Sequence, residues 1–396
     1  MAKPLSYLAS EVQASTTIAI DTMYKKMKAD GIDVIGFGAG EPDFDTPDNI
    51  KDAARRAIDE NFTRYTASSG IDPLRAAICA RLKEDCGVEY APSQVIVSNG
   101  AKMSLYLALR AVTDPGDEII LPAPYWVSYL EMIKMTSGVP VVVETGEETG
   151  YKLTAAALST AITPKTKCLI LNSPSNPSGV VYTRAELEAI AKVCVENDIY
   201  VISDEIYYKL VYGEEFVSFP ALSEEIKALT ILVNGVSKSY AMTGWRIGYC
   251  AAPANIAKVI GNYQSHASSN PNSIAQKAAQ EALVAPQDGI ETMRQAFEER
   301  KNYFVNRAKN IKDISIIEPK GAFYIMMNVS AYFGKTLSDK VIENADDFAS
   351  VFLDKGLVAV VPCTGFGAPD FIRWSYATSM DNIEKGLDRL EAFLNS

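Results

Sequence analysis

Histidine and cysteine are scarce in this sequence of 396 residues, which has one histidine, His266, and six cysteines. The cysteines are scattered, with no pair in the close spacing of a zinc or thiol-redox motif, and a zinc site would also require more histidine ligands. We therefore expect no metal centre. The cysteines are expected to be reduced and to serve in packing, at Cys79, Cys86, Cys168, Cys194, Cys250 and Cys363.

Basic clusters and long apolar runs are absent too. Lys and Arg number 38 against 49 Asp and Glu, a net charge of −11, whereas nucleic-acid binding relies on clustered positive charge. No stretch approaches the roughly 18 apolar residues of a membrane span, and M-A-K-P-L-S-Y at the N-terminus lacks the pattern of a signal peptide. We expect a cytoplasmic protein with neither nucleic-acid nor membrane partners.

The length and the 48% of hydrophobic residues are typical of a two-domain enzyme. Short apolar runs that alternate with helical patterns favour a mostly parallel sheet covered on both faces, with ligands outside the carboxyl ends of its strands. Strands are expected at 34–37, 95–97, 117–121, 139–143, 168–171, 200–202, 230–233, 247–251 and 358–361, and helices at 18–29, 48–61, 103–111 and 184–196.

A loop between two buried strands carries Lys238 and, eight residues later, Arg246. A lysine held between buried strands is desolvated, which lowers its pKa and frees the amine to form a Schiff base with a carbonyl cofactor. The planar fork of an arginine suits a phosphate. Taken alone the pair is weak, because most Lys and Arg side chains are solvated surface charges.

Other polar residues follow the same set of strands. Asn176 comes after one predicted strand, Asp204 and Tyr207 after the next, and Lys238 after the third. Because the carboxyl ends of parallel strands lie at one edge of a sheet, these side chains should gather there. Each also has an ordinary alternative, since an Asp at a strand end caps helices and Asn or Tyr often makes loop hydrogen bonds.

Three further positions are candidates for ligand contact. Gly100 and Ala101 join a strand to a helix, where free backbone N–H groups make an anion site, although many α/β proteins have such junctions for topology alone. Trp126 offers a flat face for an aromatic ring, although most tryptophans are simply buried in packing. Gly40, in the turn G-A-G-E-P-D-F-D-T-P, lets the backbone approach a ligand or simply makes a tight turn.

The segment S-K-x-x-x-M-T-G-W-R-x-G-Y at 237–249 is similar to the pyridoxal-phosphate lysine segment of class I aminotransferases, in particular the bacterial subgroup of aspartate aminotransferases. The resemblance runs from A-G-E-P-D-F-D-T-P at 39–47 to R-W-S-Y-A-T-S at 373–379. It implies the α/β fold-type I architecture, with a mostly parallel seven-stranded sheet in a large domain at 46–285. The smaller α/β domain would comprise 286–396 together with the arm and first segment at 1–45.

The resemblance also implies roles for the candidates. Lys238 would bind pyridoxal 5′-phosphate and move the substrate α-proton, Asp204 would keep the pyridine nitrogen protonated, and Tyr207 and Asn176 would hydrogen-bond the phenolic oxygen. Trp126 would stack on the ring. A homodimer with shared sites is implied because Tyr65 would reach the neighbour's phosphate. The cofactor contacts are expected from Tyr65, Gly100, Ala101, Lys102, Trp126, Asn176, Asp204, Tyr207, Ser237, Lys238 and Arg246.

Arg373 would hold the substrate α-carboxylate, in a cleft that includes Gly40, Trp126 and Asn176. The animal subgroup binds a distal carboxylate with an arginine that Y-Q-S-H-A-S-S-N-P at 263–271 does not contain. In the bacterial subgroup a lysine replaces it, which here would be Lys102, with Thr17 or Ser15 nearby. We therefore expect an aspartate aminotransferase.

Three other functions are compatible with parts of this pattern. An aminotransferase for aromatic amino acids or prephenate would keep every catalytic group and change only the side-chain pocket. A carbon-sulfur β-lyase would use the same lysine. A noncatalytic cofactor-binding regulator would normally carry a fused DNA-binding segment, which we do not find in these residues.

Overall fold

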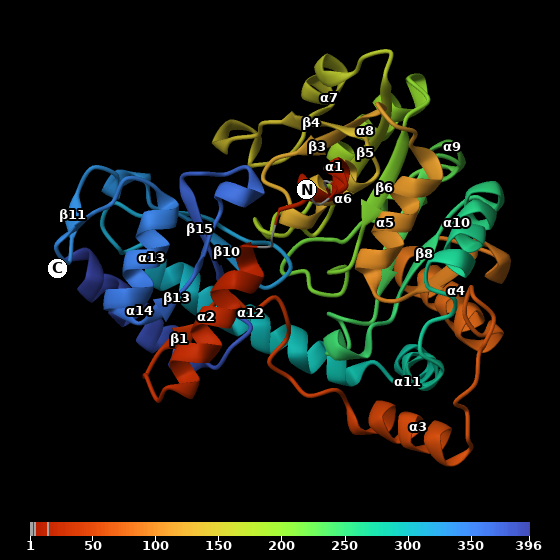
Figure 1. The fold of residues 1–396 in the computed structure, drawn as a ribbon, viewed down its shortest axis with the longest axis horizontal. Helices are drawn as coiled ribbons and strands as arrows, with labels where there is room; N and C mark the ends of the chain where they lie inside the picture. Colours follow the sequence, from red (N-terminus) through yellow and green to blue (C-terminus); the bar gives the residue numbers. More distant parts are fainter. Residues whose placement is uncertain (1–2, 4, 14–15) are drawn as a thin grey trace.

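The computed structural model describes residues 3, 5–13 and 16–396, apart from the side chains of 16–19. Figure 1 shows a larger unit built around a sheet and a smaller unit in which the C-terminal part of the chain lies beside α2 and β1. The elements up to the last strand of the large sheet are α1 (Tyr7–Ser10), α2 (Thr16–Ala29), β1 (Ile35–Gly36), α3 (Asp48–Asp59), α4 (Asp72–Cys86), β2 (Val95–Ser98), α5 (Ala101–Val112), β3 (Glu118–Pro122), α6 (Val127–Met135), β4 (Val139–Val143), α7 (Ala155–Ala161), β5 (Thr166–Asn172), α8 (Arg184–Glu196), β6 (Tyr200–Asp204), α9 (Glu224–Lys227), β7 (Thr230–Gly235) and β8 (Gly248–Ala251).

The remaining elements complete the larger unit and form most of the smaller one. They are α10 (Ala254–Ala267), α11 (Ser273–Val284), α12 (Asp288–Ala308), β9 (Ser315–Ile317), β10 (Tyr324–Asn328), β11 (Thr336–Leu337), β12 (Lys340–Val341), α13 (Ala345–Gly356), β13 (Val358–Ala359), β14 (Val361–Pro362), β15 (Phe371–Ser375) and α14 (Met380–Leu394).

The large sheet has seven strands in the order β2-β8-β7-β6-β5-β3-β4, and only β8 runs against its neighbours. The predicted fold class, with a mostly parallel seven-stranded sheet, is therefore confirmed. Its central strands β5, β6 and β7 are mostly buried, as expected for a sheet covered on both faces. Residues on one face pack with α5, α6 and α10, and those on the other face with α4, α8 and α11.

The smaller unit joins the two ends of the chain. β1 pairs in parallel with β13, and the four-stranded sheet β14-β15-β10-β9 packs among α12, α13 and α14. An aromatic cluster fills this core, including Phe37 from the N-terminal segment against Trp374 of β15, with ring centroids 4.6 Å apart. These contacts link the first segment to the last, while the domain limits at 45 and 285 stay a prediction.

Several element bounds differ from those expected. The helix expected at 103–111 begins at Ala101, because Gly100 takes a positive φ of 84° that turns the chain from β2 directly into α5. The strand expected at 358–361 is two strands, since Val358–Ala359 pairs with β1 whereas Val361–Pro362 pairs with β15. Apolar periodicity does not distinguish one long buried strand from two short ones in different sheets.

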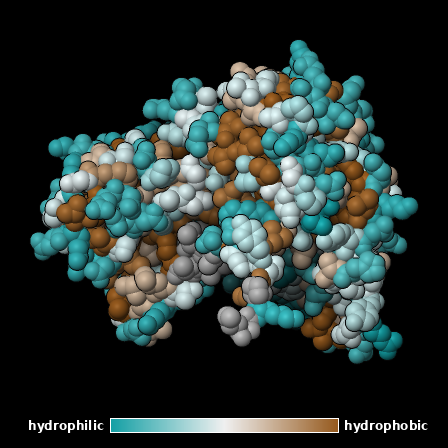
Figure 2. Space-filling view, turned by 45° about the horizontal axis from the view of Figure 1, so that its top comes forward, coloured by the Kyte–Doolittle hydropathy of each residue, from teal (hydrophilic) through white to brown (hydrophobic). Residues whose placement is uncertain are grey.

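Three further observations concern the surface, the helices and the potential metal ligands. On the face in Figure 2, hydrophilic residues cover most of the surface and hydrophobic residues appear as separate patches. None of the helices described here is long and apolar enough to cross a membrane. Within the same residues, no group of three or more His, Cys, Asp or Glu side chains is arranged to hold a metal ion.

Candidate active site

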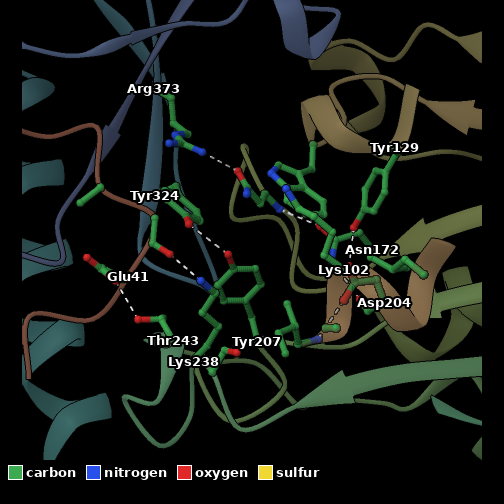
Figure 3. A pocket seen from close by; sticks show the side chains of 18 of the residues that line it. Glu41, Lys102, Tyr129, Asn172, Asp204, Tyr207, Lys238, Thr243, Tyr324 and Arg373 are labelled. Atoms are coloured by element: carbon green, nitrogen blue, oxygen red, sulfur yellow. Dashed lines mark hydrogen bonds between the residues drawn. The ribbon is translucent and has the colours of Figure 1, made fainter. Parts of the chain in front are cut away.

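A cavity of about 360 Å³ lies at the carboxyl ends of the large sheet, between the two units. The parallel strands bring its polar residues together: β5 ends four residues before Asn176, β6 ends at Asp204, and β7 ends three residues before Lys238. Figure 3 shows Asp204 and Lys238 around one space together with Tyr207 and Arg373. The predicted residues that line it are Gly40, Ala101, Lys102, Trp126, Asn176, Asp204, Tyr207, Ser237, Lys238, Arg246 and Arg373.

Lys238 is half-buried in this cavity, and its Nζ donates a hydrogen bond to the carbonyl oxygen of Gly40 at 2.5 Å. Burial lowers the pKa of Lys238 to about 8, an effect that the nearby Arg246 and Arg373 reinforce and that Glu41 and Asp204 oppose. About a tenth of the amine is therefore neutral at pH 7, far more than for an ordinary lysine. A neutral lysine amine can attack a carbonyl or accept a proton.

Asp204 is buried at the end of β6. Its Oδ2 accepts a hydrogen bond from the Tyr129 hydroxyl at 2.6 Å, and its Oδ1 accepts one from the N–H of Ile206 at 3.2 Å. Burial raises the pKa of Asp204 to about 6, while these hydrogen bonds and the charge of Lys238 hold it down. The carboxyl is thus largely ionised at neutral pH, and a cation placed beside it would favour that form further.

The start of α5 has the features of an anion-binding site. The first N–H groups of a helix have no intrahelical acceptor, and Ala101 and Lys102 both line the cavity. A Cβ at Gly100 would collide with the guanidinium of Arg246, and one at Gly248 would collide with the backbone N of Ala101. The two glycines therefore allow this close packing of backbone and arginine. In the described part of the chain no carboxylate forms an ion pair with Arg246, which leaves its charge for an anion.

Arg373 is only 2% exposed and lies on β15. It donates to Asn176 Oδ1 at 2.9 Å and to the Gly38 carbonyl at 3.1 Å, and its guanidinium carbon lies 4.4 Å from the ring centroid of Tyr324. Its Nε is buried without a hydrogen-bond partner, and no described carboxylate pairs with it. A buried arginine in this state lacks a counter-ion, and a substrate carboxylate would supply one.

Lys102, the second residue of α5, lines the same cavity. Its Nζ lies 4.7 Å from the ring centroid of Trp126, which in turn makes an edge contact with Tyr129 at 5.3 Å. Partial burial and the charge of Arg246 lower the pKa of Lys102. No ion pair of Lys102 occurs among the residues that the structure describes, so this ammonium group is a third place for an anionic ligand, after Arg246 and Arg373.

Two predicted site residues, Gly100 and Tyr65, do not line the cavity, and the side chains of two others are not described. Gly100 immediately precedes the lining residue Ala101, whereas the Tyr65 side chain is 91% exposed on the surface. Ser15 lies outside the described residues, and Thr17 falls in α2 with a side chain that is not described. The roles expected for these four residues, like those of the residues that line the cavity, stay predictions.

The sequence reasoning missed several residues that the fold brings to the cavity. Tyr129 follows Trp126 by three residues, one turn along α6, and that spacing could have indicated it. Tyr324 belongs to G-A-F-Y, and its hydroxyl lies 3.0 Å from that of Tyr207. Asn172 donates from Nδ2 to the Asp204 carbonyl at 2.9 Å. Asp21 and Glu41 line the cavity too, and nothing local in the sequence marks them.

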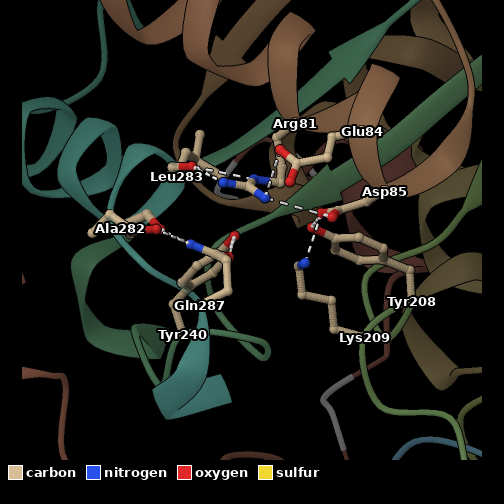
Figure 4. Close-up of polar contacts among 10 residues, drawn as sticks. Arg81, Glu84, Asp85, Tyr208, Lys209, Tyr240, Ala282, Leu283 and Gln287 are labelled. Carbon is tan, nitrogen blue, oxygen red and sulfur yellow. Dashed lines mark hydrogen bonds and ion pairs between the residues drawn. The ribbon is translucent and has the colours of Figure 1, made fainter. Parts of the chain in front are cut away.

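A polar cluster behind the cavity fixes the segment that carries Tyr207 (Figure 4). Asp85 of α4 accepts a hydrogen bond from the Tyr208 hydroxyl at 3.0 Å and lies 2.7 Å from Lys209 Nζ. Arg81, one turn earlier, donates to the carbonyl of Leu283 at the end of α11. The residues after Asp204 are thereby tied to α4, and Arg81 ties α4 in turn to α11.

Comparisons with known proteins agree with this geometry. The sequence profile described as "Aminotransferase class I and II" matches residues 32–390. An aspartate aminotransferase from Bacillus sp. strain YM-2 is 50% identical over 381 residues, 96% of each chain. An aspartate/prephenate aminotransferase from Cereibacter sphaeroides is 46% identical over 98% of each chain. Among solved structures, the aspartate aminotransferase from Thermus thermophilus with maleate superposes with a TM-score of 0.94, at 37% identity, over 99% of this chain and all of that one.

Proposed function

Because this chain belongs to the class I and II aminotransferases, which use pyridoxal 5′-phosphate, we propose that it transfers the amino group of L-aspartate to 2-oxoglutarate, giving oxaloacetate and L-glutamate. One observation carries the choice of substrate. Lys238 shares its cavity with three cations for which the described residues provide no carboxylate partner, Arg246, Arg373 and Lys102. With Arg246 assigned to the cofactor phosphate, Arg373 and Lys102 remain for the substrate. Two such cations suit a substrate with two carboxylates.

The residues present fit pyridoxal 5′-phosphate. Arg246 and the start of α5 offer the phosphate a cradle that a side chain at Gly100 would fill. Asp204 would hold the pyridine nitrogen, Tyr207 and Asn176 the phenolic oxygen, and Trp126 the ring face. When bound, the cofactor supplies a carbonyl for the amine and an electron-withdrawing ring that stabilises negative charge on the substrate α-carbon.

The chain's own groups orient the substrate and move its proton. Arg373 would bind the α-carboxylate through its fork, while Asn176 and Gly38 already hold the guanidinium in place. The Lys238 amine, with a pKa lowered to about 8, is basic enough to accept the α-proton and weak enough to return it. The Gly40 carbonyl, 2.5 Å from Nζ, holds the amine inside the cavity.

The side-chain carboxylate of aspartate would bind to Lys102. The Thermus relative has the dicarboxylate maleate in the name of its structure, and a dicarboxylate in this cavity would meet Arg373 at one end and Lys102 at the other. The ammonium group lies over Trp126 in the free cavity. A carboxylate would offer it a stronger partner than the ring does, because an ion pair is worth more than a cation–π contact at a partly desolvated site.

We propose further that the active enzyme is a cytoplasmic homodimer in which each subunit lends Tyr65 to its neighbour. An aromatic side chain that is 91% exposed suits a residue awaiting a partner surface. A second, more open cavity of about 880 Å³ adjoins the site at Thr243 and Arg246 and would admit it. The six free cysteines suit a reducing compartment. One chain has a mass of 43.1 kDa, and a mass twice as large in analytical ultracentrifugation is the result expected for the dimer.

Prephenate or an aromatic amino acid is the second candidate substrate. The Cereibacter relative is named for both aspartate and prephenate, and the Trp126 face beside Lys102 could contact a ring as well as a cation. Prephenate also carries a second carboxylate, so the same two cations would serve.

The test is a product assay with purified protein. L-aspartate and 2-oxoglutarate should give oxaloacetate and L-glutamate in equal amounts, and Lys238→Ala should abolish the reaction. Prephenate as an alternative amino acceptor and phenylalanine as an alternative amino donor are assayed in the same way. Release of pyruvate and ammonia without any added keto acid would instead indicate a carbon-sulfur β-lyase and would reject the proposal.

A further inference from the structure

A wholly buried glutamine, Gln264, lies outside the cavity but next to both parts of the expected phosphate site. It is 0% exposed near the end of α10. Its Oε1 accepts a hydrogen bond from the Ser98 hydroxyl at 2.6 Å, and its Nε2 donates to the carbonyls of Val97 at 2.8 Å and Ser68 at 2.5 Å. Both N–H bonds of the amide are therefore used, so its orientation is fixed.

The three partners of Gln264 belong to two separate functional segments. Val97 and Ser98 end β2, two residues before Gly100 and the start of α5. Ser68 lies in the loop that follows Tyr65, three residues further along the chain. The amide thus bridges the anion cradle of its own chain and the loop of the exposed tyrosine.

The loop after Tyr65 is held along its whole length. The N–H of Val97 donates to the Ser69 carbonyl at 3.0 Å. A second buried glutamine, Gln276 of α11, accepts from the N–H of Ile71 at 2.8 Å and donates to the Thr66 hydroxyl at 3.1 Å. Tyr65 itself is 91% exposed. A fixed backbone under a free side chain reduces the entropy cost of binding, because the loop is already ordered.

We infer that Gln264 is a positioning residue that holds the phosphate cradle of one subunit and the tyrosine lent to the other subunit in a single rigid unit. This inference rests on the proposed cofactor and on the proposed dimer. Gln264 contacts neither the cofactor nor the substrate, and it acts through Ser98 and Ser68. Gln276 holds the same loop but makes none of these contacts with β2.

The test measures cofactor affinity, not activity, with two ligands that differ only in the phosphate. Gln264→Met keeps the length of the side chain and removes its hydrogen bonds. Because loss of a buried hydrogen bond typically costs a factor of about 10 in an equilibrium, the affinity for pyridoxal 5′-phosphate should fall about tenfold. The affinity for pyridoxal should change less than about twofold, since it has no phosphate to be positioned.

Two further variants make the test specific. Ser98→Ala removes only the hydroxyl that donates a hydrogen bond to Gln264, and it should give a smaller loss of the same phosphate-specific kind. It replaces Gln264→Met in the test if that variant does not fold. Gln276→Met, which loosens the loop without touching β2, is the matched control. Tyr65→Phe should weaken binding of pyridoxal 5′-phosphate in the natural background and much less in the Gln264→Met background, because the loop then no longer presents the hydroxyl.

The outcomes separate this inference from the proposed function. A phosphate-specific loss in Gln264→Met that exceeds the loss in Gln276→Met, and that is not additive with Tyr65→Phe, supports it. Equal losses for pyridoxal and pyridoxal 5′-phosphate would show a general structural role and overturn it. A loss in Tyr65→Phe with none in Gln264→Met overturns the inference alone. No loss in Tyr65→Phe contradicts the shared site and the inference together.

Discussion

The hydroxyl oxygens of Tyr207 and Tyr324 lie 3.0 Å apart in the wall of the cavity, and the Tyr324 ring lies against the guanidinium of Arg373. Tyr207 is expected to contact the phenolic oxygen of the cofactor, and Arg373 is expected to hold the substrate. Tyr324 therefore touches both the cofactor tyrosine and the substrate arginine. Burial raises the pKa of both tyrosines above the ordinary value, so each hydroxyl stays protonated at neutral pH.

Replacing Tyr324 by Phe should separate these two contacts, because the ring against Arg373 remains while the hydroxyl partner of Tyr207 is lost. We expect kcat/KM for aspartate to fall about tenfold, the usual effect of losing one buried hydrogen bond. The pH at which the cofactor's visible absorption changes should shift as well. Tyr332→Phe, which removes a hydroxyl bonded to the Lys312 carbonyl in the smaller unit, serves as the control. An unshifted titration in Tyr324→Phe would disprove this role.

Replacing Arg373 by Gln should weaken substrate binding and leave the fold intact. The charge is buried without a carboxylate partner in the described residues, so its removal relieves a desolvation cost instead of breaking an ion pair. KM for both the amino acid and the keto acid should rise at least about a hundredfold, while the thermal midpoint stays the same or rises. Steady-state kinetics and thermal unfolding check this prediction. A large loss of stability with an unchanged KM would assign Arg373 a structural role.

Replacing Lys102 by Met should change specificity more than general activity. Dicarboxylic substrates lose a charged partner, whereas phenylalanine loses none. We expect kcat/KM for aspartate to fall about a hundredfold and that for phenylalanine to fall less than about threefold. Lys167→Met is the matched control, because Lys167 also lies over an aromatic ring, Tyr200, but lines a different cavity. Equal losses for the two substrates would reject Lys102 as the specificity residue.

The lowered pKa of Lys238 predicts how cofactor uptake depends on pH. Only the neutral amine attacks a carbonyl, and its fraction rises as the pH rises through the pKa. With a pKa of about 8, the uptake rate of cofactor-free protein should be half-maximal near pH 8, against about 10.4 for an ordinary lysine. Stopped-flow absorbance at several pH values measures this rate. A rate still rising steeply above pH 9 would mean that the lysine is not desolvated.

Much of this site could be predicted from sequence because its residues directly follow strands. The ends of β5, β6 and β7 place Asn176, Asp204 and Lys238 together in any parallel arrangement of these strands. The alternation of apolar runs predicted the sheet as well. The family resemblance then gave expectations for Arg373 and Lys102, whose place in the same cavity as Lys238 no local pattern indicates.

The remaining contacts depend on packing between distant segments. Tyr324 meets Tyr207 only because β10 of the smaller unit faces the larger one, a separation of 117 residues in the chain. Gln264 meets Ser68 across 196 residues. No sequence spacing indicates the contacts of Gln264 or Tyr324, because hydrogen bonds between distant segments follow from the fold and not from periodicity. The split of 358–361 into β13 and β14 has the same origin.

The absorption spectrum of the cofactor-loaded protein during addition of substrates tests the central claim most directly. Adding L-aspartate alone should remove the visible band of the cofactor held by Lys238, and adding 2-oxoglutarate should then restore it, because the amino group is taken up from one substrate and passed to the other. A band that aspartate leaves unchanged would contradict an aspartate aminotransferase while preserving the cofactor assignment.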